Sequence, residues 1–360
     1  MARSQINPNM LVLARQLRGL TQKELAKVIT VSQAKVSKME QGLLSIDKEV
    51  LNRISKKLDF PNGFFSQHGQ IYPAGISLFR KKQSLSKKDT DYINSLLNYN
   101  YISLIKLLDS IEVESNLPQL DLEEYGDPKN AAKVLRDYWN VPSGPIKNLT
   151  TLIESAGVFV FHLDIHFDKF SGIRFNVDSN IPIIALNKNQ PPDRMRFSLA
   201  HELAHIVMHK VVTPNAEKEA DVFASEFLVP SNEIRFPQRK LKLNDLADLK
   251  RYWKVSMQAL LMKANELNKL TYSQNRYLWQ QISSLGFRKR EPAELDPPFE
   301  ETTLVKELLK LHIEELEYTN EDLRTLFMVN ENDFDDWWGS YLPNYKKSQL
   351  KLRLGGLSNN

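Results

Sequence analysis

The hydrophobic period changes within this 360-residue chain, and the change restricts the folds that it can adopt. Over most of the sequence, apolar residues recur with the spacing of an α-helix. Three segments, residues 157–165, 170–177 and 180–188, instead have the period of two that is typical of β-strands. The pattern predicts a mainly α-helical protein with one small β-sheet near the middle of the chain, an α+β fold.

The first 66 residues predict an all-helical domain of the helix-turn-helix kind. Several short amphipathic segments follow one another closely, with a tight break before Ser32. Thr21 and Glu24 have the spacing of a capping box at the start of the second helix. Ser32 is suited to cap the third helix. Short helices with a tight turn between the second and third are typical of DNA-binding helix-turn-helix domains.

The charge distribution supports a DNA-binding module. The formal net charge is only +4, yet residues 1–88 hold 16 basic and 5 acidic residues, and the remainder holds 32 basic and 39 acidic residues. A basic segment joined to an acidic body is typical of polyanion binding, so we expect a double-stranded DNA operator as partner. Domains of this kind bind as dimers, so we also expect a homodimer. The third helix would present the base-reading residues Gln33, Ala34, Lys35, Ser37 and Lys38, and Gln22 would touch a phosphate or brace Gln33.

The strongest chemical signal is the sequence His-Glu-Leu-Ala-His at residues 201–205, inside a helical segment. Residues four apart lie on one face of a helix, so His201 and His205 can bind one zinc ion. Glu202 follows the first histidine and can act as general base on the attacking water, because zinc makes water more acidic. The motif therefore predicts a hydrolytic zinc site.

A catalytic zinc ion needs a third protein ligand and one open position. The chain has no cysteine, so the ligand must be His, Asp or Glu. The next predicted helix, residues 214–228, offers Glu217 as our preferred ligand and Glu219 as the alternative. Asp221 is suited to hold a ligand histidine through its second ring nitrogen. His209 lies one turn beyond His205 and could be a ligand, but we expect it to be a surface or substrate-side histidine.

Two further expectations concern the sheet. Residues 182–187 are our candidate for an edge strand that pairs with an extended peptide. His162 and His166 share a strand face at a distance too large for one metal ion, so we interpret them as structural. No oxyanion-stabilising residue can be identified from the motif.

Composition shifts divide the chain into regions. We expect a helix-turn-helix domain at residues 1–66, a basic linker at 67–90, a zinc metallopeptidase domain at 91–240, a helical extension at 241–290 and a C-terminal helical region at 291–360. Within 91–240, the helical lead-in is 91–156 and the catalytic core 157–235. No apolar run approaches the roughly 20 residues that cross a bilayer, and the first residues lack a signal-peptide pattern, so we expect a cytoplasmic protein without membrane contact.

The sequence resembles the ImmA/IrrE family of zinc metallopeptidases fused to an Xre-type helix-turn-helix. The resemblance rests on LTQKELAKVITVSQAKVSKMEQG, PIIALN, RMRFSLAHELAHIVMHK and EKEADVFASEFLVP, in the order of the family. It implies a zincin-like domain of gluzincin type with one Zn²⁺ ion, ligands His201 and His205, base Glu202, and a third ligand within EKEAD. The family often has Asn where this chain has Asp221.

Such proteins are implied to be bacterial or mobile-element regulators that cleave a partner protein under stress or in phage defence. The substrate would be a repressor or an antitoxin, and cleavage can depend on an activating signal. Two alternatives remain open: a non-proteolytic transcription factor whose zincin-like domain is a sensor or scaffold, and a toxin–antitoxin component whose zincin-like domain only binds a partner. The intact Glu202 favours catalysis, because a purely structural metal site needs no base.

Overall fold

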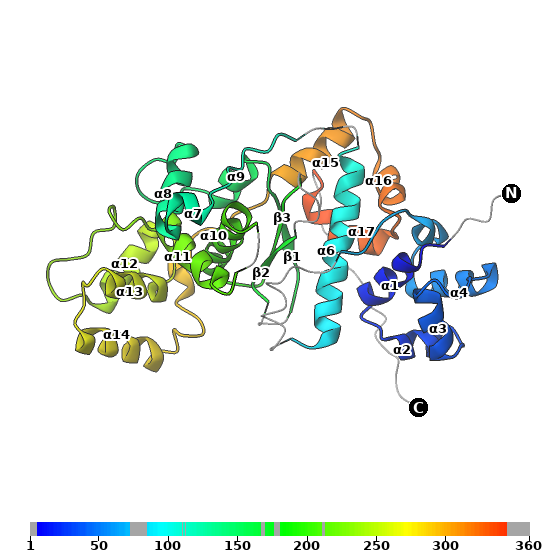
Figure 1. The fold of residues 1–360 in the computed structure, drawn as a ribbon, viewed down its shortest axis with the longest axis horizontal. Coiled ribbons are helices and arrows are strands. Elements are labelled where there is room, and N and C mark those ends of the chain that lie inside the picture. The colour runs from blue at the N-terminus through cyan, green and yellow to red at the C-terminus, as the bar shows by residue number, and fades with distance from the viewer. Residues whose placement is uncertain are drawn as a thin grey trace. The chain divides into compact units, whose positions relative to one another are not determined.

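The computed structural model describes residues 6–72, 85–109, 111, 113–166, 170–175, 181–210 and 213–343. It is mostly helical with one small sheet, as the hydrophobic periods predict (Figure 1). The chain forms two compact units: unit 1 comprises residues 1–71, 98–111 and 305–360, and unit 2 comprises residues 72–97 and 112–304. Half of the expected linker 67–90, residues 73–84, and part of the expected strand 170–177 lie outside the described residues.

The secondary structure follows this division. Unit 1 contains α1 (Pro8–Leu17), α2 (Gln22–Val28), α3 (Gln33–Glu40), α4 (Lys48–Leu58), η1 (Asn62–Ser66), nearly all of α15 (Leu304–Glu314), α16 (Asn320–Phe327), α17 (Glu331–Trp337) and η3 (Gly339–Tyr341), and α6 (Lys87–Leu107) is divided between the units. Unit 2 contains α7 (Leu122–Tyr125), α8 (Pro128–Tyr138), α9 (Leu149–Glu154), β1 (Phe159–Leu163), β2 (Gly172–Phe175), β3 (Ile183–Asn187), α10 (Pro192–Met208), α11 (Ala216–Leu228), α12 (Leu243–Trp253), α13 (Met257–Glu266), α14 (Tyr272–Ser284) and η2 (Ala293–Leu295).

The helix-turn-helix of unit 1 is formed by α2 and α3. The hydroxyl of Thr21 accepts from the backbone N–H of Glu24 at 3.2 Å, and the Glu24 carboxylate accepts from the N–H of Thr21 at 2.7 Å. This reciprocal capping box fixes the start of α2. Thr30 lies between the helices with a φ of 59°, and Ser32 caps α3 through the N–H of Lys35. Local capping chemistry therefore determines where both helices begin.

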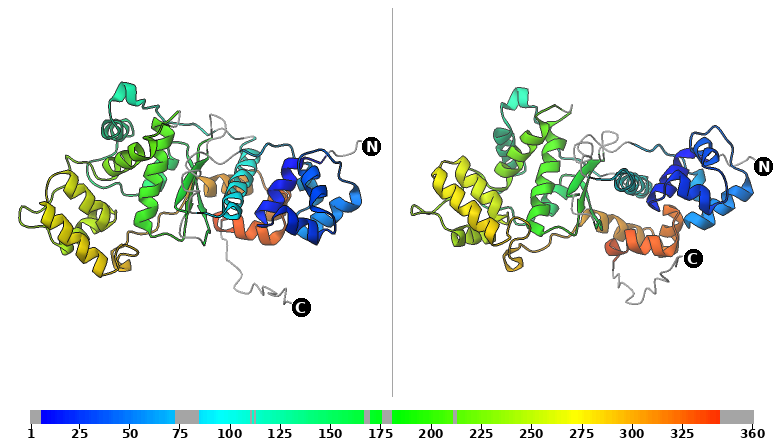
Figure 2. Two further views of the ribbon diagram at one scale, coloured as in Figure 1. Left: turned by 60° about the horizontal axis from the view of Figure 1, so that its bottom comes forward. Right: turned by 90° about the horizontal axis from the view of Figure 1, so that it is seen from below.

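The C-terminal helices of unit 1 pack on the helix-turn-helix domain (Figure 2). The Arg18 guanidinium donates to Asp333 at 2.8 Å. The ring of Trp337 lies 4.7 Å from that of Tyr99 and 6.4 Å from that of Phe60, measured between centroids. These ion-pair and aromatic contacts join the helix-turn-helix domain to helices about 300 residues later, although the two regions are predicted to be separate.

In unit 2 the strand order is β1-β3-β2, with β1 parallel and β2 antiparallel to β3. The expectation that residues 182–187 form an edge strand is wrong, because β3 has a neighbour on each side. All five residues of β3 are buried, as in a strand that is covered on both faces. The edge strands are β1 and β2, and β2 lies against α10.

Helix α10 is the central element of unit 2. α10 begins at Pro192. Proline is favourable there because a backbone N–H at the start of a helix has no hydrogen-bond partner within the helix. Its buried face packs closely against α11, where Ala220 and Ala224 are fully buried. Small side chains at this contact let the two helix backbones approach, which brings the acidic residues of α11 to the histidines of α10. No described helix is long and apolar enough to span a bilayer.

Candidate metal centre

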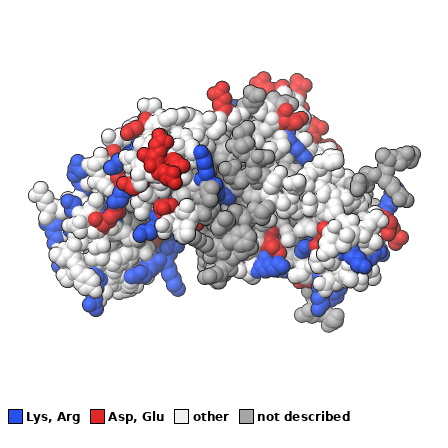
Figure 3. All heavy atoms as spheres, in the orientation of Figure 1, with Lys and Arg blue, Asp and Glu red and all other residues white. Residues whose placement is uncertain are grey.

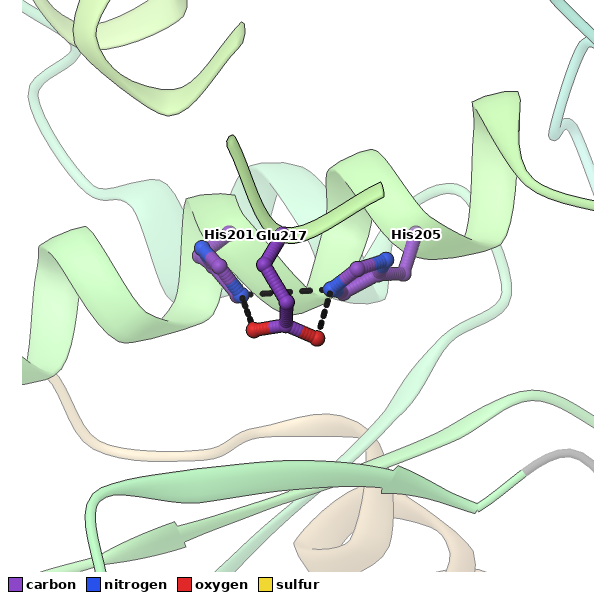
Figure 4. A group of neighbouring side chains, drawn as sticks. All are labelled: His201, His205 and Glu217. Carbon is purple, nitrogen blue, oxygen red and sulfur yellow. Dashed lines mark hydrogen bonds and ion pairs between the residues drawn. The ribbon is translucent and has the colours of Figure 1, made fainter. Parts of the chain in front are cut away.

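Three side chains from α10 and α11 converge on one point. Figure 4 shows His201, His205 and Glu217 pointing toward one another. The two Nε2 atoms lie 3.2 Å apart, and each is 3.5 Å from one carboxylate oxygen of Glu217. Of the two acids that the sequence offers as third ligand, the structure therefore places Glu217 beside both histidines.

The arrangement fits a tetrahedral metal ion. Ligand atoms about 2.0–2.1 Å from zinc and separated by the tetrahedral angle are about 3.3 Å apart, close to the three separations measured here. Two imidazole nitrogens and a carboxylate are also a donor set that zinc uses in catalytic sites. The three ligands found among the described residues account for three corners of a tetrahedron, and a hydrolytic site uses the fourth for water.

Asp221 holds His201 from the other side of the ring. Its Oδ1 lies 2.9 Å from His201 Nδ1, in the position that we expected for it. Burial by itself lowers the pKa of His201, but the hydrogen bonds to Asp221 and Glu217 outweigh it and raise the pKa to about 9. The hydrogen bonds from His201 and His205 hold the pKa of the Glu217 carboxyl well below its usual range. Both shifts have one cause: the carboxylates of Asp221 and Glu217 stabilise positive charge at this point, as they would stabilise a bound divalent cation.

We expect Asp221→Asn to weaken zinc binding by about tenfold and Asp221→Ala by up to about 100-fold. The asparagine amide oxygen can still accept from His201 Nδ1–H, but the carboxylate charge is lost. The affinity is measured on metal-free protein by competition with a chromophoric chelator. Asp137→Asn, at an exposed carboxylate of α8, is the control for the change in net charge. If wild type and Asp221→Ala bind zinc with equal affinity, Asp221 does not support the metal site.

Glu202 is only 1% exposed and is oriented by the edge strand β2. Its Oε2 accepts a hydrogen bond from the backbone N–H of Arg174 at 3.1 Å. The Arg174 guanidinium in turn donates to the carbonyl oxygen of His205. Burial lowers the pKa of Arg174, and the charges of Glu202 and Glu217 oppose this shift. No local motif in the sequence marks Arg174, because its partner Glu202 lies 28 residues later, on a helix.

The expectation that His209 is a surface residue is wrong. It is 6% exposed, and its Nδ1 lies 2.9 Å from Nδ1 of His205. Its Nε2 lies 3.1 Å from Oε2 of Glu219, so Glu219 contacts His209 and is absent from the three-residue cluster. The sequence contains one indication that His209 lies near the cluster. His201, His205 and His209 are spaced four residues apart, and residues with this spacing are neighbours on one face of a helix. The expectation that His162 and His166 share a strand face is wrong: His162 lies in β1 and packs against Phe299, whereas His166 lies beyond the end of β1 and is exposed.

The predicted DNA-reading residues lie on α3. Gln33, Ala34 and Lys38 are exposed, and Lys35 and Ser37 are half-buried. Basic side chains lie on the surface of this domain (Figure 3). Gln22 differs from our expectation of a brace to Gln33: its amide donates to Glu40 at 2.8 Å, and Glu40 also pairs with Arg15. Gln22 therefore ties α2 to the end of α3.

Comparison with known proteins agrees with this architecture. Residues 153–265 match the profile of the IrrE N-terminal-like domain, a peptidase family, and residues 11–61 match that of the helix-turn-helix. No curated protein matches the chain. Among solved structures, the Bacillus thuringiensis PlcR complex with the peptide PapR7 and DNA shares 15% identity over 89% of this chain and 90% of its own, with a TM-score of 0.17, too low to support an argument. The chain joins an Xre-type helix-turn-helix domain to an IrrE/ImmA-like domain.

Proposed function

We propose that this transcriptional regulator is also a zinc-dependent endopeptidase that cleaves a partner protein. The observation that carries the proposal is the convergence of His201, His205 and Glu217 on one point, with the carboxylate of Glu202 held beside them. A site that only binds a structural ion has no use for a buried, oriented base. The match of residues 153–265 to a peptidase family supports the same interpretation.

The residues of this chain have separate roles in the proposed reaction. His201, His205 and Glu217 would hold Zn²⁺, which when bound supplies a Lewis acid for the scissile carbonyl and the attacking water. Glu202 takes a proton from the attacking water and delivers it to the leaving amide nitrogen. The backbone N–H of Arg174 holds the carboxylate of Glu202 in place for both transfers. Asp221 keeps the proton of His201 on Nδ1, so that Nε2 faces the ion.

The proposed substrate is a repressor or an antitoxin that acts with this protein in the cytoplasm. Cleavage at one site would inactivate such a partner and change transcription of the genes that it controls. DNA binding through α3, as a homodimer on an operator, would bring the peptidase to the regulated promoter. The proposal thus assigns one regulatory task to both domains.

The test combines metal analysis of the purified protein with mass spectrometry of the products of neighbouring genes after incubation with it. One equivalent of zinc and a single new cleavage site in one product support the proposal. Zinc without cleavage, in the presence of each candidate partner and with DNA added, would favour a sensor or partner-binding scaffold. Absence of zinc from protein purified without chelators would contradict the proposed site.

We expect the double substitution Gln33→Ala and Lys35→Ala to weaken operator binding by about 2–4 kcal/mol, since each base contact contributes about 1–3 kcal/mol. Binding is measured by gel shift against the selected operator and against unrelated duplex at one salt concentration. Lys56→Ala with Lys57→Ala, on α4, removes two exposed charges away from α3 and is the control. Unchanged discrimination between operator and unrelated DNA would exclude Gln33 and Lys35 from base reading.

A further inference from the structure

We propose that His209 and Glu219 are positioning residues that act through His205, the buried ligand of the cluster. The inference rests on the proposed zinc site. It adds Glu219, a carboxylate that acts on a ligand histidine through a second ring, to Asp221, which contacts a ligand histidine directly. His205 contacts no carboxylate through its Nδ1 atom in the interactions described above. Instead its Nδ1 lies 2.9 Å from Nδ1 of His209, and His209 Nε2 lies 3.1 Å from Oε2 of Glu219.

The proton positions along this chain of contacts follow from the ligand role of His205. A ligand nitrogen carries no proton, so with Nε2 facing the ion the proton of neutral His205 must be on Nδ1. Nδ1 then donates to His209 Nδ1, which must be the unprotonated nitrogen of that ring. His209 therefore carries its proton on Nε2 and donates it to Glu219. Each ring nitrogen of His205 and His209 is therefore a donor, an acceptor or a metal ligand, and the last acceptor is the carboxylate of Glu219.

The different surroundings of the two ligand histidines explain why one is held directly and the other through a second ring. The side chain of Asp221, which contacts His201, is 60% exposed, so its charge remains hydrated. His205 and His209 side chains are each only 3% exposed. A carboxylate placed directly on His205 would lose most of its water, which is costly for a charge. The His209 ring spans the buried layer and lets the carboxylate of Glu219, 24% exposed, stay in contact with solvent.

The test measures the zinc affinity of metal-free protein by chelator competition, so it does not depend on peptidase activity. We expect His209→Leu to weaken zinc binding by about 10–100-fold, the range for partners of ligand histidines. His209→Gln should remain within about threefold of wild type, because its amide can accept from His205 and donate to Glu219. Glu219→Gln should lie between them, about three- to tenfold weaker. Glu124→Gln, an exposed carboxylate of α7, is the charge control.

The pattern among the variants decides the proposal. Unchanged affinity in both His209→Leu and Glu219→Gln would overturn it, and equal losses in His209→Leu and His209→Gln would show that packing alone matters. If His209→Leu fails to fold, as judged by circular dichroism, the zinc affinities of His209→Gln and Glu219→Gln still test the proposal. If the variants show the expected order of zinc affinities but the wild type cleaves no candidate partner, the proposed function is contradicted. The inference about His209 and Glu219 is then still supported.

Discussion

Glu202→Gln is expected to abolish cleavage of the partner protein while zinc remains bound. Glutamine has nearly the same shape and can still accept a hydrogen bond from the N–H of Arg174, but it cannot take a proton from water. Loss of a general base lowers the rate by about 10²–10⁴-fold. The rate is measured as the appearance of the cleaved product under single-turnover conditions, and the metal content by elemental analysis of the same samples.

The zinc measurement makes this result specific to the base. His201→Ala should lose zinc and cleavage together, whereas Glu202→Gln should lose cleavage alone. Glu124→Gln should match wild type in both measurements. A Glu202→Gln protein that cuts its substrate at the wild-type rate would show that another group accepts the proton.

Trp338→Ala is expected to lower the free energy of unfolding of unit 1 by about 3–5 kcal/mol, the range for removal of a buried tryptophan. The side chain is fully buried, and its ring stacks on Phe327 at 4.4 Å and lies 6.2 Å from Tyr341. Because the C-terminal helices pack on the helix-turn-helix domain, we also expect weaker operator binding near the lowered melting temperature. Urea unfolding followed by circular dichroism, together with a gel shift, measures both effects.

Leu316→Ala is the matched control in unit 1, because Leu316 is 44% exposed. Its effect should stay below about 1 kcal/mol, since substitutions at exposed positions leave no cavity. Loss of unit 1 stability in Trp338→Ala without any change in operator binding would indicate that the C-terminal helices are dispensable for the helix-turn-helix.

Local chemistry in the sequence predicts much of the fold. Thr21, Glu24 and Ser32 cap the helices that they were expected to cap, because a capping box depends on residues three apart. The spacing of His201 and His205 on a helix likewise determines that their rings face the same way. Features of this kind need no knowledge of distant parts of the chain.

Features that depend on contacts between distant parts of the chain are harder to predict from the sequence. The period of two predicts strands but not their order, so it does not show that β3 lies between β1 and β2. The buried environment of His209 depends on how α11 packs, and the contact between Arg18 and Asp333 joins residues 315 apart. No spacing rule links such positions in a single sequence.

The discontinuous make-up of unit 1 has a consequence for biosynthesis. Residues 305–343 are translated after the whole of unit 2, yet they belong to the same compact unit as the helix-turn-helix domain. During translation Arg18 and Phe60 can contact Asp333 and Trp337 only after the whole of unit 2 has been made. We therefore expect that premature stop codons ahead of position 305 yield products whose DNA-binding domain is unstable, even though every residue of that domain is present.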